Sequence, residues 1–357
     1  MIKRFAVLIL IFILVGCEPQ ATLAPTQAPP LATATPTPQP TTFLDKPTPQ
    51  HIRVMSYNVN WDSIFADDDP LNDSLRSGNR VAQFQRILKA IQPDVVCLQE
   101  INSRRDPKQV SAILDAALPL SDGEMWRAHR GQDNVIVARF DLELRADETI
   151  HQQRALTRGH ALALVDMPDA TYASDLYMVC AHFKSSGGDL NVQLRQHHAD
   201  ALIEWVRDIQ TPGGKIDLAK GTPWIILGDL NAYDTDPAYH VTTLVTGDIV
   251  NEDKYGPDTK PDWDGTVATD ALPRHNGTGS ETYTWRNDAE GFSPGALDRI
   301  IYADSVMRVD NSFVLNTTTM TPGELQAAGL EANDVFLNPR TGYYDHLPLV
   351  VDIGFAR

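Results

Sequence analysis

Six short polar motifs recur along the chain, and each stands where a strand is expected to end. In chain order they are Ser56-Tyr57-Asn58, Gln99-Glu100, His182-Phe183-Lys184, Gly228-Asp229-Leu230-Asn231, Leu297-Asp298-Arg299-Ile300 and Asp345-His346, and most rather than all of them follow an apolar run directly. Apolar, β-branched runs of about four to eight residues are typical of buried strands. Because α/β folds carry their chemistry at the carboxyl ends of buried strands, the motifs together predict one site.

The carboxylates and amides in these motifs suit a hard metal ion. Glu100 ends a buried strand on the same face as Val96 and Leu98, and Asn58 has the matching position on the first strand. Mg²⁺ takes oxygen ligands of this kind, usually only one or two protein carboxylates. Taken alone, a glutamate at this position fits a surface residue that starts a loop as well as it fits a metal ligand.

Strand geometry gives Asp229 and Asn231 a common direction. Side chains alternate along a strand, so both should point into one crevice while Leu230 packs away. An anionic oxygen beside an amide suits a water molecule bound to a metal, or a phosphate oxygen. A capped turn is the alternative interpretation, because Asp and Asn are common turn residues.

Two histidines could move protons near neutral pH. His182 ends a core strand, where a lone histidine is more often a satisfied core residue. His346 follows Asp345, and neighbouring strand residues point opposite ways, so this pair can serve two functions. Asp298 could hold the His346 imidazole in one tautomer and favour its charged form. The other histidines, His198 included, are interpreted as solvated.

The elements that must position these residues follow from the apolar pattern. Helices at 81–91 and 191–210 carry apolar residues at three- and four-residue steps, and a further helix is expected at 108–118. Residues 246–295 are rich in Asp, Gly, Pro and Thr, which predicts a long and often functional loop. Strands are expected at 52–59, 95–99, 135–139, 161–165, 176–182, 222–228, 299–303 and 347–353.

The chain begins with a basic start and a short apolar run from Phe5 to Val15, which predicts a signal peptide over residues 1–16. A membrane-spanning anchor needs about 20 apolar residues, and this run is shorter. Leu14-Val15-Gly16-Cys17 resembles the bacterial lipobox. That resemblance implies a lipid on Cys17 and an extracytoplasmic protein anchored to the bacterial cell membrane.

The 33 residues that follow Cys17 are mostly Thr, Pro, Ala and Gln. Such a composition has too little apolar surface to offset the entropy of ordering, so residues 17–50 are expected to form a lipidated, disordered tether. The folded domain is then expected over residues 51–357, which is ample for a large core.

The formal net charge of the chain is -17, and it becomes -19 once Lys3 and Arg4 leave with the signal peptide. Broad, passive binding of nucleic acid needs a basic surface, so this charge argues against it. The charge is compatible with an enzyme that holds one phosphate through a metal and a few local cations.

Cys97 and Cys180 are the cysteines that remain after Cys17, and both lie inside predicted core strands. An unpaired thiol at such a position behaves as a small apolar side chain, which is the expectation here. A disulfide between them is the alternative, and it depends on a geometry that spacing alone does not give.

Taken together, the motifs resemble the endonuclease/exonuclease/phosphatase superfamily, and in particular its deoxyribonuclease I-like and secreted bacterial nuclease members. The resemblance spans residues 51–355 and implies an α/β fold, a four-layer αββα sandwich of two mixed β-sheets with helices outside. It rests on Met55-Ser56-Tyr57-Asn58, Leu98-Gln99-Glu100, Ala181-His182-Phe183-Lys184-Ser185, Gly228-Asp229-Leu230-Asn231, Leu297-Asp298-Arg299-Ile300 and Asp345-His346-Leu347-Pro348.

The resemblance also implies roles at the metal. Glu100 resembles the principal metal ligand, with Asn58 and Asp345 close to the metal, which would be Mg²⁺ or Mn²⁺. Asp229 and Asn231 resemble the pair that orients the attacking water and contacts the phosphate.

Further roles concern the proton and the phosphate. Asp298 and His346 resemble the coupled pair at the scissile phosphate, and His182 resembles a second histidine that has a glutamate partner in deoxyribonuclease I-like members. No such glutamate is identified in this chain. Arg158 and Lys184 are candidate phosphate contacts, with ordinary surface cations as the alternative.

These features predict a Mg²⁺-dependent phosphoesterase, foremost a monomeric extracytoplasmic nuclease whose substrate is nucleic acid. A phosphodiesterase or phosphatase on lipid head groups (sphingomyelinase-like) or inositol phosphates is the second hypothesis, because the membrane tether and acidic surface favour it. A catalytically inactive binding protein is the third, and the presence of every expected acidic and imidazole group argues against it.

Overall fold

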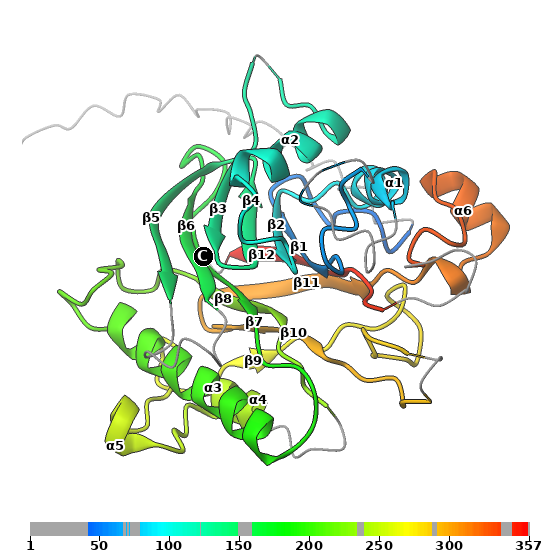
Figure 1. Cartoon of the computed structure of the whole chain (residues 1–357). Coiled ribbons are helices and arrows are strands. Elements are labelled where there is room, and N and C mark those ends of the chain that lie inside the picture. The colour runs from blue at the N-terminus through cyan, green and yellow to red at the C-terminus, as the bar shows by residue number, and fades with distance from the viewer. Residues whose placement is uncertain are drawn as a thin grey trace, which may run out of the picture. The chain divides into compact units, whose positions relative to one another are not determined.

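Two six-stranded β-sheets pack face to face in the computed structural model of this chain. Sheet A has the strand order β11-β12-β1-β2-β4-β3, and sheet B has the order β5-β6-β7-β8-β10-β9. Both sheets are mixed, because β1 is parallel to β2 and β7 to β8 while the other pairs are antiparallel. Helices α1 and α2 cover sheet A, and α3 and α4 cover sheet B (Figure 1). The predicted four-layer sandwich is confirmed.

The structure describes residues 42–66, 69, 71, 79–121, 123–148, 159–233, 239–287, 291–336 and 345–355. The strands are β1 Ile52–Asn58, β2 Val95–Gln99, β3 Arg127–Gly131, β4 Asn134–Ala138, β5 Asp141–Glu148, β6 His160–Asp166, β7 Leu176–His182, β8 Trp224–Asp229, β9 Thr269–Asp270, β10 Asp298–Tyr302, β11 Met307–Val314 and β12 Leu349–Phe355. The helices are α1 Val81–Ile91, α2 Pro107–Ala117, α3 Asp189–Ile209, α4 Tyr239–Thr246, α5 Glu252–Tyr255, the 3₁₀ helix Thr317–Thr319 and α6 Pro322–Ala328.

The middle strands divide their side chains between two cores. In β2, Val95 and Cys97 face the core between the sheets, whereas Val96 and Leu98 face the helices that cover sheet A. The same alternation holds in β1, β7, β8 and β10, so every second side chain points into the space between the sheets. At one edge of the two sheets the inward residue that ends each of these strands, or begins it in the antiparallel β10, is polar: Asn58, Gln99, His182, Asp229 and Asp298.

The sequence analysis located the central strands and the two long helices to within about two residues, but it did not predict the edge strands of the two sheets. Strands β3, β5, β9 and β11 were not predicted, and these four are the edge strands of the two sheets. Edge strands in natural proteins carry charged and polar residues, so the apolar run that identifies a buried strand is absent. The expected loop at 246–295 contains only short elements among its described residues, namely α5 and β9.

The folded domain begins earlier than the sequence predicted. Residues 42–50, which were assigned to the tether, lie on the domain: the Phe43 ring packs edge-on against Phe313 at 5.1 Å, and Lys46 pairs with Asp94 at 2.6 Å. One aromatic residue among Thr and Pro gives no periodic signal, so the composition of this segment predicted a disordered tether. Cys17 lies outside the described residues.

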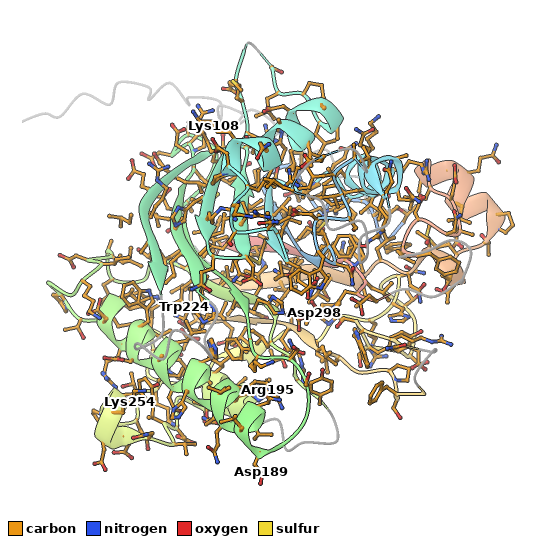
Figure 2. All side chains as sticks on the ribbon, viewed as in Figure 1. Lys108, Asp189, Arg195, Trp224, Lys254 and Asp298 are labelled. Carbon is orange, nitrogen blue, oxygen red and sulfur yellow. A yellow bond between two sulfur atoms is a disulfide. The ribbon has the colours of Figure 1, made fainter. Side chains whose placement is uncertain are left out.

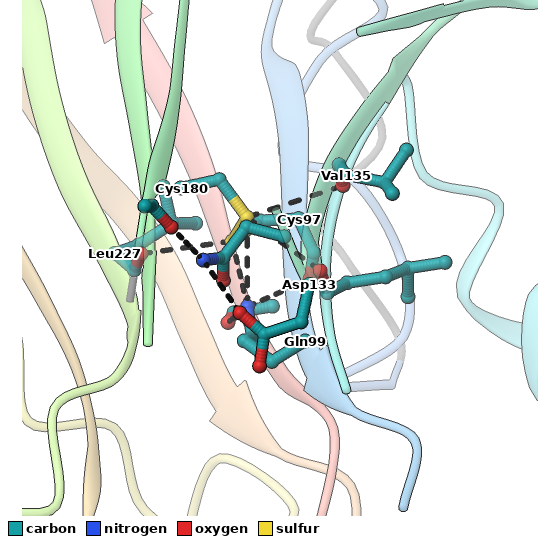
Figure 3. Close-up of a disulfide and its surroundings, with 10 residues drawn as sticks. Cys97, Gln99, Asp133, Val135, Cys180 and Leu227 are labelled. Carbon is teal, nitrogen blue, oxygen red and sulfur yellow. Dashed lines mark hydrogen bonds between the residues drawn. A yellow bond between two sulfur atoms is a disulfide. The ribbon is translucent and has the colours of Figure 1, made fainter. Parts of the chain in front are cut away.

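The expectation of two separate thiols is wrong. Cys97 on β2 and Cys180 on β7 form a disulfide, which joins sheet A to sheet B within the fully buried core (Figure 3). The two cysteines are 83 residues apart in the sequence. Closing a loop of that length is worth about 4–5 kcal/mol in the chain-entropy model.

No helix in the described parts of the chain has the length and apolar character needed to cross a membrane.

Three histidines surround Phe183 in the core between sheet B and its helices. His160, His198 and His240 are 0%, 0% and 3% exposed, which corrects the expectation that His198 is solvated. His198 stacks on the Phe183 ring at 4.9 Å, and its Nδ1 lies 3.1 Å from His160 Nε2. Burial lowers the pKa of His160 to about 3, so this imidazole stays neutral in the folded protein.

This burial predicts a loss of stability in mild acid. The unfolded chain protonates His160 near pH 6.5, whereas the folded chain does so only near pH 3. The free energy of unfolding is therefore highest above pH 6.5 and falls as the pH drops below that value. Between about pH 7.5 and about pH 5 one such histidine should cost about 2 kcal/mol. Urea unfolding at both values checks this, and His160→Asn should make the pH dependence shallower by that amount. An unchanged slope in the variant would contradict the prediction.

Candidate active site

Three polar side chains stand in a row at the end of sheet B. His182 on β7 lies opposite Asp229 on β8, and Asp298 on β10 lies opposite Asp229 from the other side. All three are almost fully buried, and His182 Nε2 is 3.4 Å from Asp229 Oδ2. Asp298 lies at the end of its strand (Figure 2). Residues 47 to 116 positions apart thus form one polar row because their strands are neighbours.

His346 completes this row. Its Nδ1 is 2.8 Å from Asp298 Oδ2, and its Nε2 is 3.5 Å from Asp229 Oδ2. The backbone holds the imidazole there, because Leu347 N–H donates to the Thr284 carbonyl at 2.7 Å. The Thr284 hydroxyl also donates to Asp298 Oδ2 at 2.5 Å, which orients the carboxylate. One imidazole therefore lies between two buried carboxylates.

The electrostatics favour a charged His346. Burial opposes the imidazolium, but the carboxylates of Asp298 and Asp229 outweigh burial and raise the pKa of His346 well above its usual value. Burial likewise opposes the Asp229 carboxylate, yet His346, His182 and the hydrogen bonds lower its pKa. Burial raises the pKa of Asp298. We take the imidazolium as the neutral-pH state, since it relieves the repulsion between two buried carboxylates.

Sheet A contributes Asn58 and Glu100 from across the space between the sheets. The Asn58 amide donates to Glu100 Oε1 at 3.2 Å and to Asp229 Oδ2 at 3.0 Å. The expected common face of Glu100 with Val96 and Leu98 is wrong, since those two side chains face the helices. Glu100 has a left-handed backbone (φ 63°), which ends the alternation and turns its carboxylate into the site.

Asp345 joins the site through two residues that the sequence did not single out. Asn60 donates its side-chain amide to Asp345 Oδ2 at 2.7 Å, and the Trp285 indole N–H donates to Asp345 Oδ1 at 2.8 Å. Asn60, Trp61 and Asp62 all have positive φ, between 48° and 63°. Asn60 follows the first motif by two positions, and that proximity is the one signal that could have found it.

Asn231 does reach the site, although not by strand alternation. The strand ends at Asp229, and Asn231 has a left-handed backbone (φ 50°). Its backbone N–H donates to Asp229 Oδ1 at 3.0 Å, and its side-chain amide donates to the Phe183 carbonyl at 3.2 Å. Leu230 packs away into the helix-side core, as predicted. The turn interpretation of this motif therefore holds, while a contact of Asn231 with water or phosphate stays a prediction.

His182 has an aspartate as its partner where the sequence offered no glutamate. His182 Nδ1 is 3.0 Å from Asp133 Oδ2. Asp133 lies in the tight turn between β3 and β4 of sheet A, so the contact crosses from one sheet to the other. Asp133 stands among ordinary turn residues, and nothing in the sequence distinguishes it from a solvated one.

The expected phosphate contacts have different outcomes. Lys184 follows the catalytic row by two residues and is partly exposed, while Arg158 lies outside the described residues. Arg195 on α3 is fully buried and donates to the carbonyls of Lys184 and Ser186, both at 2.9 Å (Figure 2). Arg195 therefore holds the loop that carries Lys184.

The donor set fits a hard divalent cation. Ligand atoms of Asp229, Asp298 and His346 all lie within 4.8 Å of one another, and the buried Asp298 Oδ1 has no hydrogen-bond partner among the described residues. An imidazolium cannot ligate a metal, so while His346 is charged the groups that would hold a cation are the carboxylates of this cluster, together with Glu100 and the Asn58 amide oxygen from the facing sheet. Oxygen ligands of this kind are those that Mg²⁺ prefers.

Residues 55–319 match the sequence profile of the Endonuclease/Exonuclease/phosphatase family. The chain belongs to this family. Its members are hydrolases that act on phosphoester bonds, which agrees with a buried row of carboxylates and imidazoles at the strand ends. The expected resemblance is thereby confirmed over most of the folded domain. No curated protein matches the chain at the level of sequence.

Solved structures share the fold at low identity. The human Nocturnin catalytic domain with bound sulfate has a TM-score of 0.51 and 17% identity, covering 86% of this chain and 95% of that one. A family protein from Bacteroides thetaiotaomicron has a TM-score of 0.52 and 17% identity, covering 86% and 98%. Truncated TDP2 from Caenorhabditis elegans has a TM-score of 0.50 and 16% identity, covering 86% and 98%.

The Asp298–His346 contact predicts that these residues act as one unit. Asp298→Asn and His346→Ala should each lower kcat by on the order of 10²–10⁴, because positioned proton-transfer groups contribute that much. The double variant should be little worse than the worse single variant. Steady-state kinetics of the wild type, the two single variants and the double variant checks this. Asp270→Asn is the control, because the Asp270 carboxylate lies outside the row and pairs with Arg299 at 2.6 Å. Fully additive losses would contradict the pairing.

Proposed function

We propose that this protein is a divalent-metal-dependent nuclease that works outside the cytoplasm as a monomer. The observation that carries the proposal is His346 between Asp298 and Asp229, with Asn58 linking Asp229 to Glu100 across the two sheets. This combination offers one cationic proton donor, one carboxylate held ionised and one carboxylate, Glu100, placed to bind a metal. Those are the parts that hydrolysis of a phosphodiester needs.

Each residue has a definite task in this proposal. Asp229, ionised and oriented by Asn58 and by the Asn231 N–H, accepts a hydrogen bond from the attacking water and aligns it. His346, held charged by Asp298, donates to a phosphoryl oxygen on which charge builds. Glu100 and Asn58 would hold a Mg²⁺ ion, which would supply further charge stabilisation to the phosphate.

His182 is the proposed donor to the leaving oxygen. Its Nδ1 contacts Asp133, which orients the ring and leaves Nε2 directed at the site, 3.4 Å from Asp229 and 4.0 Å from Glu100. A histidine oriented in this way can pass a proton near neutral pH. Protonation of the leaving alkoxide is required because an alkoxide is a poor leaving group in water.

Exposed aromatic side chains beside the site favour nucleic acid as the substrate. Trp61 is 42% exposed and Phe292 is 56% exposed, and Phe292 lies against Trp285 with ring centroids 6.0 Å apart. Trp61 adjoins Asn60, and both Asn60 and Trp285 hold Asp345, so the two aromatic surfaces flank one carboxylate. Bases of a single strand stack on such surfaces at about 1–3 kcal/mol each, whereas a net charge of -17 opposes long contact with a duplex.

Two observations support a location outside the cytoplasm. The chain starts with the predicted signal peptide and lipobox, and its core contains the Cys97–Cys180 disulfide. Structural disulfides form and persist in oxidising compartments and are rare in the cytosol. The two features are independent, because one is read from the first 17 residues and the other from the folded core.

A substrate panel tests the activity. The compact unit of residues 39–357 should cleave single-stranded DNA or RNA in Mg²⁺ or Mn²⁺, cleave duplex DNA more slowly, and lose activity in EDTA. Glu100→Gln should raise the metal concentration required for half-maximal rate. Faster hydrolysis of sphingomyelin or inositol phosphates than of any nucleic acid would favour the lipid or small-ester hypothesis. Full activity in chelator would overturn the metal-dependent mechanism.

Trp61→Ala provides the matched test of base stacking. Its KM for a single-stranded oligonucleotide should rise on the order of tenfold, with kcat little changed, because stacking contributes to binding rather than to the chemical step. Trp61→Phe keeps an aromatic face and should restore most of the loss. An equal KM in all three proteins would remove the aromatic argument for nucleic acid.

The lipid anchor has its own test. Cys17→Ser should release the protein from membranes or leave it unprocessed, because the modified thiol is absent. Fractionation of cells that express each form checks this, together with mass spectrometry of the mature N-terminus. If the variant stays on the membrane and the wild type carries no lipid, the anchor proposal is wrong.

A further inference from the structure

The proposed site is divided between two sheets, and their relative position decides whether it works. Sheet A supplies Asn58, Glu100 and Asp133, while sheet B supplies His182 and Asp229. Three of the contacts between these groups cross from one sheet to the other. They are Asn58 to Asp229 at 3.0 Å, His182 to Asp133 at 3.0 Å and His182 to Glu100 at 4.0 Å.

Apolar packing alone fixes this spacing poorly. The core between the sheets is built of Val, Ile, Leu, Met and Ala side chains. Contacts of that kind are not directional, so they hold the sheets together without specifying which residue lies opposite which. Misplacing a catalytic group by about 1 Å can cost on the order of 100-fold in rate.

The disulfide lies where it can supply the missing constraint. Cys97 is three residues before Glu100 on the chain, and Cys180 is two residues before His182. Both cysteines are inward-facing, in the row directly beneath the catalytic row. Among the described residues this is the one covalent bond between the sheets apart from the chain itself.

Gln99 connects the disulfide to the catalytic row above it. Its amide nitrogen lies 2.7 Å from Cys97 Sγ and 3.6 Å from Cys180 Sγ, and it donates to the Cys97 carbonyl at 3.2 Å (Figure 3). Gln99 is fully buried and directly precedes Glu100. The left-handed turn that aims Glu100 into the site therefore starts from a residue seated on the disulfide.

We propose that Cys97 and Cys180 are positioning residues, and that their disulfide makes hydrolysis conditional on folding in an oxidising compartment. This inference rests on the proposed function. A chain that folds while its cysteines are thiols has both halves of the site without the bond that sets their spacing. The cytoplasmic precursor of a degradative enzyme would then have low activity until export.

The chemistry of this device is a two-electron reduction. A dithiol breaks the S–S bond, each sulfur gains one electron and one proton, and the reductant becomes a cyclic disulfide. Both cysteines are 0% exposed, so a reductant in solution has little access to the folded protein. The state is therefore set when the chain folds and is not expected to reverse afterwards.

The experiment compares four forms of the full chain without its signal peptide. They are the oxidised protein, the protein refolded in dithiothreitol, Cys97→Ala/Cys180→Ala, and a control, Val95→Ala/Leu176→Ala. Val95 and Leu176 begin the same two strands and face the same core, so the control loosens the sheets at the end away from the site. Cys97→Ala/Cys180→Val refills the core if the double alanine variant fails to fold.

Two readouts are taken where circular dichroism shows every form folded. The first is kcat and KM on a single-stranded oligonucleotide in Mg²⁺. The second is independent of activity: the downfield NMR resonance of the His182 Nδ1 proton, assigned by its loss in Asp133→Asn. Reduced protein and cysteine variant should lose on the order of 10- to 100-fold in kcat with KM little changed, and the resonance should weaken. The control should keep both.

Equal kcat in the oxidised and cysteine-free proteins would overturn the proposal, as would an equal loss in the control. If the oxidised protein hydrolyses no substrate at all, the proposed function has failed, and the NMR readout still decides the inference. A His182 resonance unchanged without the disulfide would then reject positioning, and its loss in the cysteine variants alone would support it.

Discussion

The hydrogen bond from the Asn58 amide to Asp229 is the contact on which the rest of the site depends. It joins the last inward residue of β1 to the last inward residue of β8, across the space between the sheets. The two strands end at the same level only if the sheets pack in one register along their whole length. The apolar core below, the disulfide within it and the polar row above are therefore parts of one structure.

The backbone bends at the points where this row needs side chains that a strand cannot supply. Glu100 and Asn231 have left-handed backbones, and so do the three consecutive residues Asn60–Asp62. Each non-glycine residue in that region costs about 1 kcal/mol or more, so the surrounding contacts must hold it there. Asp62 is one such anchor, because its carboxylate is buried against Arg105 at 2.9 Å. Part of the backbone strain in the described chain therefore lies beside the carboxylates of the candidate site.

Charge at the site is balanced locally rather than by the surface. The molecule is strongly acidic, yet within the buried row Asp229 and Asp298 share the His346 imidazolium. Burial alone would favour neutral groups, and mutual attraction in a medium of low dielectric constant favours charged ones. A phosphate ester that approaches this row is attracted by the His346 imidazolium and repelled by the Asp229 carboxylate. A divalent metal ion would reduce that repulsion.

The sequence by itself determined the αββα fold, the family and most residues of the candidate site, because apolar runs identify the central strands and polar pairs flank them. His182, Asp229, Asp298 and His346 all lie where such a pattern places them. The edge strands escaped prediction because their charged residues prevent pairing with other chains and also erase the apolar signal.

Only the tertiary structure decided the contacts between segments far apart in the chain. Asp133 as the partner of His182, Trp285 as the partner of Asp345 and the Cys97–Cys180 disulfide all depend on how two sheets pack, and no local pattern encodes that packing. The direction of Glu100 also belongs here, because one left-handed residue reverses the face that alternation assigns. Local sequence preference determines where a strand ends, whereas the packing of the two sheets determines which side chains contact the residues at that end.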